Sequence, residues 1–311
     1  MRFTFNRCLL PLLAASVLSI VGCSTTEQRS TSNMAAAREA KKELKELRAD
    51  IKKIEPFFKP MGKPATSDWL ATHNEPGQTF EEYLDANPTR PTKERQKIYI
   101  LPLGSLNAQQ RGIITITAGY LAAFYDLPVE QMPMRKLDPP LAQIRYNKTA
   151  RSRQIKTAYI LSDILKPLLP ADAAAMIAFT SEDLYPDQSM NYVFGQASLE
   201  DRVGVWSLHR LDDNTDDRGF LLRTLKIAAH ETGHMFSMRH CIKYECAMSG
   251  TNHLAETDSR PIDACPECMA KISWMSDIAP IKRYNALEKF CRDNRLNREA
   301  DDFKAKAKAL E

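Results

Sequence analysis

Histidine and cysteine are crowded into one short stretch of this 311-residue chain. Four of the six histidines and four of the seven cysteines lie between His230 and Cys268. Both side chains are common metal ligands, so this stretch constrains what the chain can fold around more than any other feature. The composition is otherwise that of an ordinary globular protein, with 43% hydrophobic and 26% charged residues. A net charge of +4 is too small to indicate a nucleic-acid partner.

The first 22 residues are typical of a secretory signal rather than of a folded element. Arg2 and Arg7 precede an apolar run over residues 8–22, and Cys23 follows a small residue. This layout resembles a bacterial lipobox, in which the cysteine is lipidated and becomes the new N-terminus. A plain signal peptide or a short anchor helix is the alternative. We therefore expect a lipoprotein of the bacterial cell envelope, held by a lipid anchor on the periplasmic side of the outer membrane.

The rest of the chain divides into a tether, an N-terminal segment and a larger domain. Residues 23–33 are small and polar, as in a flexible tether. Residues 34–95 begin with an amphipathic helix predicted over residues 34–54. They continue as a proline-rich stretch of extended chain and turns, with a short helix near residues 80–84. From residue 96 to residue 311, strand-like and helical patterns alternate, which predicts an α/β domain of mixed α+β character.

Within this domain, short apolar runs mark strands and longer apolar periodicities mark helices. The run over residues 173–180 is apolar without interruption, as in a central strand that is covered on both faces. The expected elements are strands at 97–103, 129–137, 173–180, 192–197 and 203–208, and helices at 107–125, 157–168, 217–237 and 281–310.

The long helix carries the sequence His-Glu-Thr-Gly-His at residues 230–234. Residues four apart lie on one helical face, so His230 and His234 can bind one metal ion, with His240 as a third ligand. Three imidazoles leave one position of a zinc ion open for water. Glu231, one step round the helix, can take the proton of this zinc-activated water as it attacks a carbonyl carbon. The pattern predicts hydrolysis of an amide, most simply a peptide bond.

The clustered cysteines form a second candidate metal site, made of Cys241, Cys246, Cys265 and Cys268. Four thiolates in two pairs, the second pair a C-x-x-C, are typical of a structural zinc site. Two disulfides are the alternative, and an extracytoplasmic location favours them. A C-x-x-C pair bonded to itself makes a redox disulfide, which has no evident partner chemistry here. We therefore favour zinc, which gives two zinc ions per chain. Cys291 has no pairing signal, and we expect it to be buried as a small apolar residue.

Taken together, these residues resemble the signature of the archaemetzincins, which are metzincin-clan zinc metallopeptidases with a second, four-cysteine zinc site. The likeness covers most of residues 65–290. It includes the segments 67–84, 183–185, 191–197, 207–210, 252–254 and 260–261. The resemblance implies a metzincin-like twisted mixed sheet, an active-site helix and a zinc-stabilised C-terminal subdomain.

The resemblance also implies roles for single residues. His230, His234 and His240 would bind the catalytic zinc, and Glu231 would be the general base. The four clustered cysteines would bind the structural zinc. Met248 would be the Met-turn residue, an apolar floor beneath the histidines. Residues near 192–197 would form the sheet edge that binds an extended peptide or protein substrate as an added strand.

One position departs from the metzincin pattern, which has glycine where this chain has Ser237. Glycine lets the chain turn sharply after the helix, and another residue in left-handed backbone costs about 1–2 kcal/mol. We expect an altered turn geometry here without loss of zinc.

These observations favour a monomeric, envelope-anchored zinc metallopeptidase. The alternative is a catalytically weak, zinc-stabilised scaffold that binds peptides or envelope partners, and a non-peptidase amide hydrolase also stays open. Retention of Glu231 favours the enzyme, because a scaffold could lose this residue without losing the metal, whereas Ser237 favours the scaffold. We expect His73, His209 and His253 to be structural.

Overall fold

The computed structural model describes residues 41–149, 151–198 and 200–311. The chain divides into two compact units, Met1–Lys45 and Glu46–Glu311. The elements named below belong to the second unit. The boundary expected between residues 95 and 96 stays a prediction.

The predicted signal segment, Cys23 and the tether lie outside the described residues. Of the helix predicted over residues 34–54, residues 41–54 are helical and the rest lies outside the described part. No helix within the described ranges is both long enough and apolar enough to cross a bilayer.

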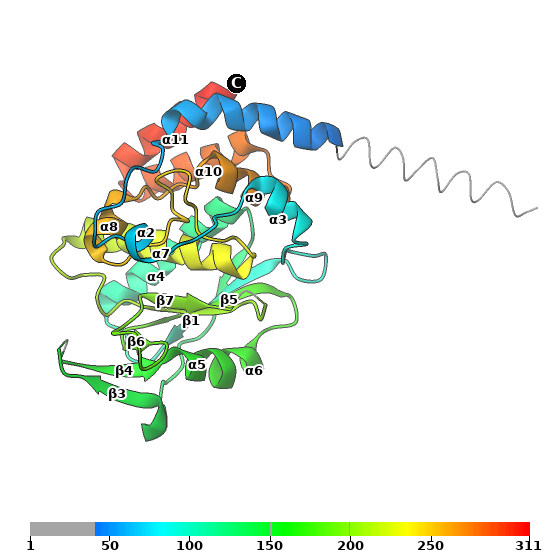
Figure 1. Ribbon diagram of the computed structural model, residues 1–311. Helices are drawn as coiled ribbons and strands as arrows, with labels where there is room; N and C mark the ends of the chain where they lie inside the picture. Colours follow the sequence, from blue (N-terminus) through cyan, green and yellow to red (C-terminus); the bar gives the residue numbers. More distant parts are fainter. Residues whose placement is uncertain (1–40, 150, 199) are drawn as a thin grey trace, which may run out of the picture. The chain divides into compact units, whose positions relative to one another are not determined.

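A five-stranded sheet lies at the centre of the second unit (Figure 1). Its strands stand in the order β2-β1-β5-β8-β7. They are β1 (Lys97–Leu103), β2 (Val129–Gln131), β5 (Ala173–Thr180), β7 (Gly195–Ala197) and β8 (Val203–Ser207). Strands β2, β1, β5 and β8 run parallel to one another, and β7 lies antiparallel to β8 at one edge. All residues of β5 are buried, which confirms the predicted central strand. Strands β2 and β7 are shorter than predicted.

Helices cover both faces of this sheet (Figure 1). On one face lie α4 (Ala108–Tyr125) and α7 (Asp217–Met235). On the other lies a continuous helical segment made of α5 (Thr157–Tyr159), a π-helical turn (Ile160–Leu165) and α6 (Lys166–Leu168). Asn107 caps the N-terminus of α4, and its side chain accepts a hydrogen bond from Gln110 N. Asp216 caps α7 in the same way and accepts a hydrogen bond from Gly219 N. The predicted helices are thus confirmed.

A second, three-stranded sheet was not predicted. It has the order β3-β4-β6, with β3 (Ile144–Asn147), β4 (Ser152–Lys156) and β6 (Asp183–Tyr185). Three of the nine residues in β3 and β4 are arginine or lysine, so neither strand contains an apolar run. Their pairing with each other and with β6 comes from tertiary contacts rather than from a local pattern.

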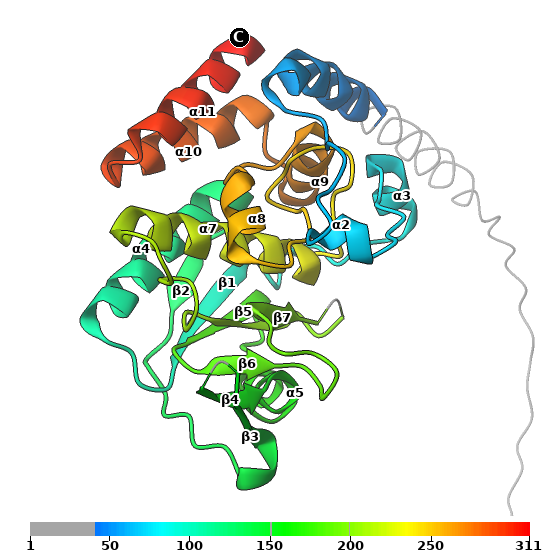
Figure 2. The same ribbon diagram turned by 60° about the vertical axis from the view of Figure 1, so that its left-hand side comes forward.

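The C-terminal part is helical, as predicted, but its last stretch is two helices. The elements are α8 (Leu254–Ser259), α9 (Pro266–Ser276), α10 (Pro280–Asp293) and α11 (Asn297–Leu310). The chain turns between α10 and α11 at Arg295, which has a φ of 59°. The two helices then lie side by side (Figure 2). Arg283 and Lys306 both bind the buried carboxylate of Asp263, which ties α10 and α11 to the loop before α9.

Most of residues 56–95 is extended chain and turns, as predicted, and the segment contains two short helices. These helices are α2 (Trp69–Thr72), which was not predicted, and α3 (Phe80–Asp85), which was. We call residues 67–79 the strap. The strap lies against the loop that follows α7, through hydrogen bonds from Gln78 Nε2 to Ser237 O and from Arg239 N to Gln78 Oε1.

Candidate active site

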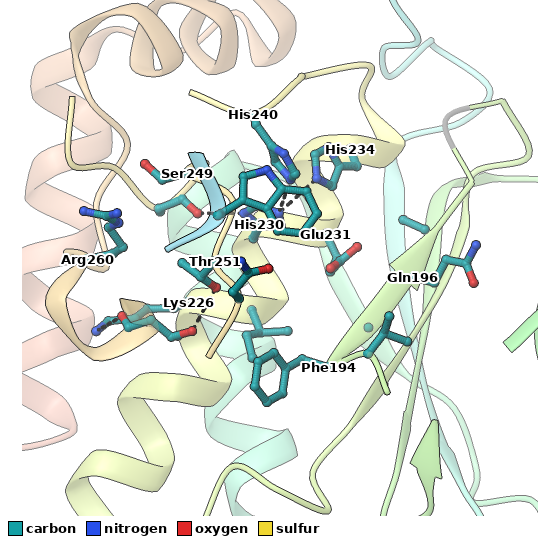
Figure 3. Close-up of a pocket in the computed structure, with 18 of the residues that line it drawn as sticks. Phe194, Gln196, Lys226, His230, Glu231, His234, His240, Ser249, Thr251 and Arg260 are labelled. Carbon is teal, nitrogen blue, oxygen red and sulfur yellow. Dashed lines mark hydrogen bonds between the residues drawn. The ribbon is translucent and has the colours of Figure 1, made fainter. Parts of the chain in front are cut away.

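Helix α7 and the loop after it bring three imidazole rings together (Figure 3). His230 and His234 lie one turn apart on the same face of α7, and His240 reaches back from the loop. The Nε2 atom of His230 lies 2.9 Å from Nε2 of His234 and 3.2 Å from Nε2 of His240. The structure therefore brings the three predicted zinc ligands to one point, where they form a group that could hold a metal ion.

The chemistry of this group fits a metal cation. Each ring has an oxygen acceptor at Nδ1: Ala247 O for His230, Met238 O for His234 and the Glu75 carboxylate for His240. Burial lowers the pKa of His230, and it lowers that of His234 to about 4, so both rings are neutral at neutral pH. A neutral ring that donates from Nδ1 has its lone pair on Nε2. Three lone pairs directed at one another repel unless a cation lies between them.

Glu231 lies beside the histidines and faces strand β7 (Figure 3). A Cβ atom at Gly195 would lie 3.3 Å from Glu231 Cδ, so the glycine lets the edge strand approach the carboxylate closely. Desolvation raises the pKa of Glu231 to about 8. A positive charge at the histidines would favour the ionised form, which is the form that can accept a proton.

Met248 lies directly beneath the helical turn that carries the two helix ligands. Its side chain is fully buried, and a Cβ atom at Gly233 would lie 2.5 Å from Met248 Sδ. An alanine at this position of α7 would require the end of the Met248 side chain to shift. This close packing at Gly233 was not predicted, because the sequence does not show which side chain packs against that face of the helix.

Ser237 adopts left-handed backbone, with a φ of 63°. The sharp turn that a glycine would make is therefore kept, and the altered geometry expected at this position is not seen. The reason is hydrogen bonding to residues of the N-terminal segment. The Ser237 hydroxyl accepts a hydrogen bond from Thr89 N at 3.0 Å, and Tyr83 donates from its hydroxyl to Phe236 O at 2.9 Å. A hydrogen bond contributes about 1 kcal/mol, which offsets about half or more of a backbone strain of about 1–2 kcal/mol.

The four clustered cysteines are buried and their sulfur atoms converge. Cys241 Sγ and Cys265 Sγ are 3.5 Å apart, far longer than the roughly 2.05 Å of a disulfide. The structure therefore has four free thiols here rather than the alternative of two disulfides. Backbone N–H groups of Met248 and Cys265 donate to Cys246 Sγ at 3.4 and 3.2 Å, as expected for a thiolate ligand. This donor set fits a tetrahedral zinc ion. Cys291 is buried elsewhere, as predicted.

A cavity of about 460 Å³ opens beside the histidines. Helix α7 forms one wall, and β7 with the preceding loop, residues 190–194, forms another. Trp69 of the strap forms a third wall and meets the His240 ring edge-on, with ring centroids 5.2 Å apart. The His73 ring also stacks on Trp69, with ring centroids 3.6 Å apart. The cavity therefore joins the predicted metal site to the predicted substrate-binding edge.

An ion pair holds the loop before β7 in place. Arg210 donates from Nε and Nη2 to the buried Asp183 carboxylate at 2.9 and 2.7 Å, and its guanidinium lies 3.9 Å from the centre of the Tyr192 ring. Asp183, Tyr192 and Arg210 belong to three of the segments that resemble the archaemetzincins. Their shared role is to shape one wall of the cavity.

A third group of potential ligands, Asp68, His253 and Glu256, is better explained by helix capping. His253 caps the N-terminus of α8, and its Nδ1 accepts a hydrogen bond from Glu256 N at 3.1 Å, so its proton is on Nε2. The Glu256 carboxylate accepts from the backbone N–H groups of Trp69 and Asn252. This arrangement leaves no lone pair on His253 for a metal, in agreement with the structural role expected for this histidine.

Comparison with known proteins places the chain among peptidases. Residues 163–274, which contain all seven predicted zinc ligands, match the model of peptidase family M54. Mouse archaemetzincin-2 is 33% identical over 276 residues, which span 78% of this chain and 77% of that protein. Archaemetzincin from Archaeoglobus fulgidus is 30% identical over 178 residues, 57% of this chain and 99% of that protein. The crystal structure of archaemetzincin from Methanopyrus kandleri matches with a TM-score of 0.50 and 26% identity, covering 60% of this chain and 99% of that chain.

These likenesses and the histidine cluster define a zinc metallopeptidase. More specifically, the chain belongs to the archaemetzincin family, peptidase family M54, as the motifs implied. The mixed α/β fold expected from that resemblance is confirmed.

Proposed function

We propose that the protein is an envelope-anchored zinc metallopeptidase in which Glu231 is the general base. The observation that carries this proposal is the convergence of three imidazole Nε2 atoms beside the Glu231 carboxylate, on the wall of a cavity that reaches an edge strand. All of these groups come from one chain, which supports a monomer as the working unit.

His230, His234 and His240 would hold the catalytic ion. Zinc, when bound, supplies a positive charge that polarises a carbonyl oxygen and makes water more acidic. The Glu231 carboxylate takes the proton from the attacking water and passes it to the leaving amine. Its place next to the ligands, against the backbone of Gly195, holds it close to any peptide that lies along β7.

An extended peptide is the substrate that fits this edge. Among the described residues, β7 has β8 as its one strand partner, so the other edge of β7 is available for main-chain hydrogen bonds. A peptide added there would cross the cavity between β7 and α7. Addition of a strand to a sheet edge is a common mode of peptide recognition.

Cys241, Cys246, Cys265 and Cys268 would hold a second, structural ion. Cys241 directly follows His240, and its N–H donates to Met248 O at 2.8 Å. A metal at the four sulfur atoms would therefore fix the loop that carries the third histidine and the Met-turn together. We propose two zinc ions per chain on this basis.

Anchoring in the envelope is supported by the sequence of the first 23 residues. Replacing Cys23 by serine tests it: the wild-type protein should fractionate with the outer membrane and carry a lipid, and Cys23→Ser should carry none. Wild-type protein that lacks a lipid would contradict the anchor and leave the peptidase proposal intact.

Cleavage of a peptide library by wild-type protein and by Glu231→Gln, with zinc content measured for both, tests the mechanism. We expect the substitution to leave the bound zinc in place and to lower the cleavage rate by about 10²- to 10⁴-fold. Zinc-loaded wild-type protein that cleaves no peptide would instead support the scaffold alternative.

A further inference from the structure

We infer that Glu75 is a positioning residue for His240, and that the strap thereby completes the candidate zinc site. This inference rests on the proposed function, because it assigns His240 to the catalytic ion. Glu75 lies outside residues 163–274, which match the family model. It belongs to the segment 67–84 that resembles the archaemetzincins, but neither the spacing nor the resemblance assigned it a role.

The contact is short and involves both carboxylate oxygens. His240 Nδ1 lies 2.8 Å from Glu75 Oε1 and 2.9 Å from Oε2, although the two residues are 165 positions apart in the chain. The geometry makes Nδ1 the donor and leaves the Nε2 lone pair directed toward His230.

The three histidines differ in what holds them. The two histidines on α7 donate to backbone carbonyls of neighbouring segments, and their rings are further fixed by the helix. His240 comes from a loop, and its acceptor is the one carboxylate among the three. A carboxylate that accepts from a ligating histidine fixes the ring orientation and raises the basicity of the ligand nitrogen. His240, which no helix holds in place, therefore donates to a charged acceptor, whereas the two helix histidines donate to neutral carbonyl groups.

The Glu75 carboxylate has no competing structural task. Within the described part of the chain, His240 is its only ion-pair or hydrogen-bond partner. Other residues anchor the strap. Trp69 N donates to the Glu256 carboxylate, and Lys271 Nζ donates to Gln78 O at 2.6 Å. Substitution of Glu75 should therefore change the environment of His240 and leave the strap in place.

Zinc affinity is the property that this contact should control. We would load the full-length protein with zinc and titrate it with chelators of increasing strength, following the metal released. A His230→Ala variant, which lacks the histidine site, identifies which release step belongs to the histidines. Release from the cysteines serves in every sample as an internal control for folding.

We expect Glu75→Ala to weaken zinc binding at the histidines by about 10- to 100-fold, the usual effect of removing such a partner. Glu75→Gln keeps an acceptor oxygen but removes the charge, so its affinity should lie between those of wild type and Glu75→Ala. Glu94→Gln is the matched control, because it removes the same charge from the same N-terminal segment, at a side chain that among the described residues bonds only to Thr92. This control should match wild type.

The possible failures separate the two proposals. If wild-type protein releases zinc from the histidines and both Glu75 variants release it at the same chelator strength, the role of Glu75 is wrong and the proposed function stands. If wild-type protein shows no release step that His230→Ala removes, the histidine site does not bind zinc and both proposals are wrong.

Discussion

Replacement of Asp183 by asparagine should destabilise the protein more than any neighbouring change of charge. The Asp183 carboxylate has no exposed surface and accepts hydrogen bonds from Arg210 at 2.7 and 2.9 Å, from Ser152 Oγ at 2.6 Å and from Gln154 Nε2 at 2.8 Å. Asparagine offers one acceptor oxygen and turns an NH₂ group toward these donors. Removal of one partner of a buried ion pair costs about 3–5 kcal/mol. Because the Arg210 side chain keeps 17% of its surface exposed, water can partly solvate it, and we expect a loss of about 3 kcal/mol.

Urea unfolding of zinc-loaded protein measures this loss, and the adjacent residue provides the control. Glu182 pairs with Arg153 at 3.5 Å, and their side chains are 27% and 47% exposed. An exposed pair of this kind contributes less than about 1 kcal/mol, so Glu182→Gln should change stability little. A loss for Asp183→Asn no larger than that for Glu182→Gln would refute the reasoning.

The pH dependence of this difference gives a further check. Burial acts to raise the pKa of Asp183, but hydrogen bonds from Arg210, Ser152 and Gln154 outweigh it and hold the pKa below its ordinary value. A carboxyl whose folded pKa is lowered contributes its full stability above the unfolded pKa, about 3.9. That contribution is lost as the pH falls through the folded pKa. The stability gap between wild type and Asp183→Asn should therefore be constant from about pH 5 to pH 8 and shrink below about pH 4. A gap that widens with acidity would contradict this assignment.

Three further substitutions test the site. Ser237→Gly relieves about 1–2 kcal/mol of backbone strain but loses the hydrogen bond from Thr89 N, worth about 1 kcal/mol. Thermal unfolding should therefore show a change within about 1 kcal/mol, and a loss of several kcal/mol would show that the hydroxyl does more. Gly233→Ala gains about 1 kcal/mol of helix propensity, but its Cβ would meet Met248 Sδ at 2.5 Å. Overpacking costs about 1–3 kcal/mol, so urea unfolding should show a net loss, and a net gain would mean that Met248 can move aside freely. Cys265→Ser removes one of four sulfur ligands, so metal analysis should find one zinc ion fewer than in wild type, and an unchanged zinc content would contradict the cysteine site.

Both predicted ligand sets could be read from the sequence because their spacing is local. His230 and His234 are one helical turn apart, and the helix that carries them has a clear N-terminal cap at Asp216. The C-x-x-C pair likewise lies at the start of a helix, α9. The central strand β5 could be predicted for the same reason, because an uninterrupted apolar run is a property of neighbouring residues in the chain.

The remaining features depend on residues that are distant in sequence. Glu75 reaches His240 across 165 positions, and no periodicity or motif connects the two. The close approach to Gly233 arises because the side chains of Met248 and Tyr125 pack there. Strands β3 and β4 form through pairing with each other and with β6, and their charged sequences carry no strand signal of their own. Ser237 keeps a left-handed turn because Thr89 supplies a hydrogen bond that the sequence does not show.

Anomalous scattering at the zinc edge from crystals of the purified protein tests the central claim most directly. The account predicts two peaks per chain. One should lie within about 2.1 Å of the Nε2 atoms of His230, His234 and His240, and the other about 2.3 Å from the four clustered cysteine sulfur atoms. Absence of a peak at the histidines in zinc-loaded protein, or disulfide bonds in place of the second peak, would contradict it.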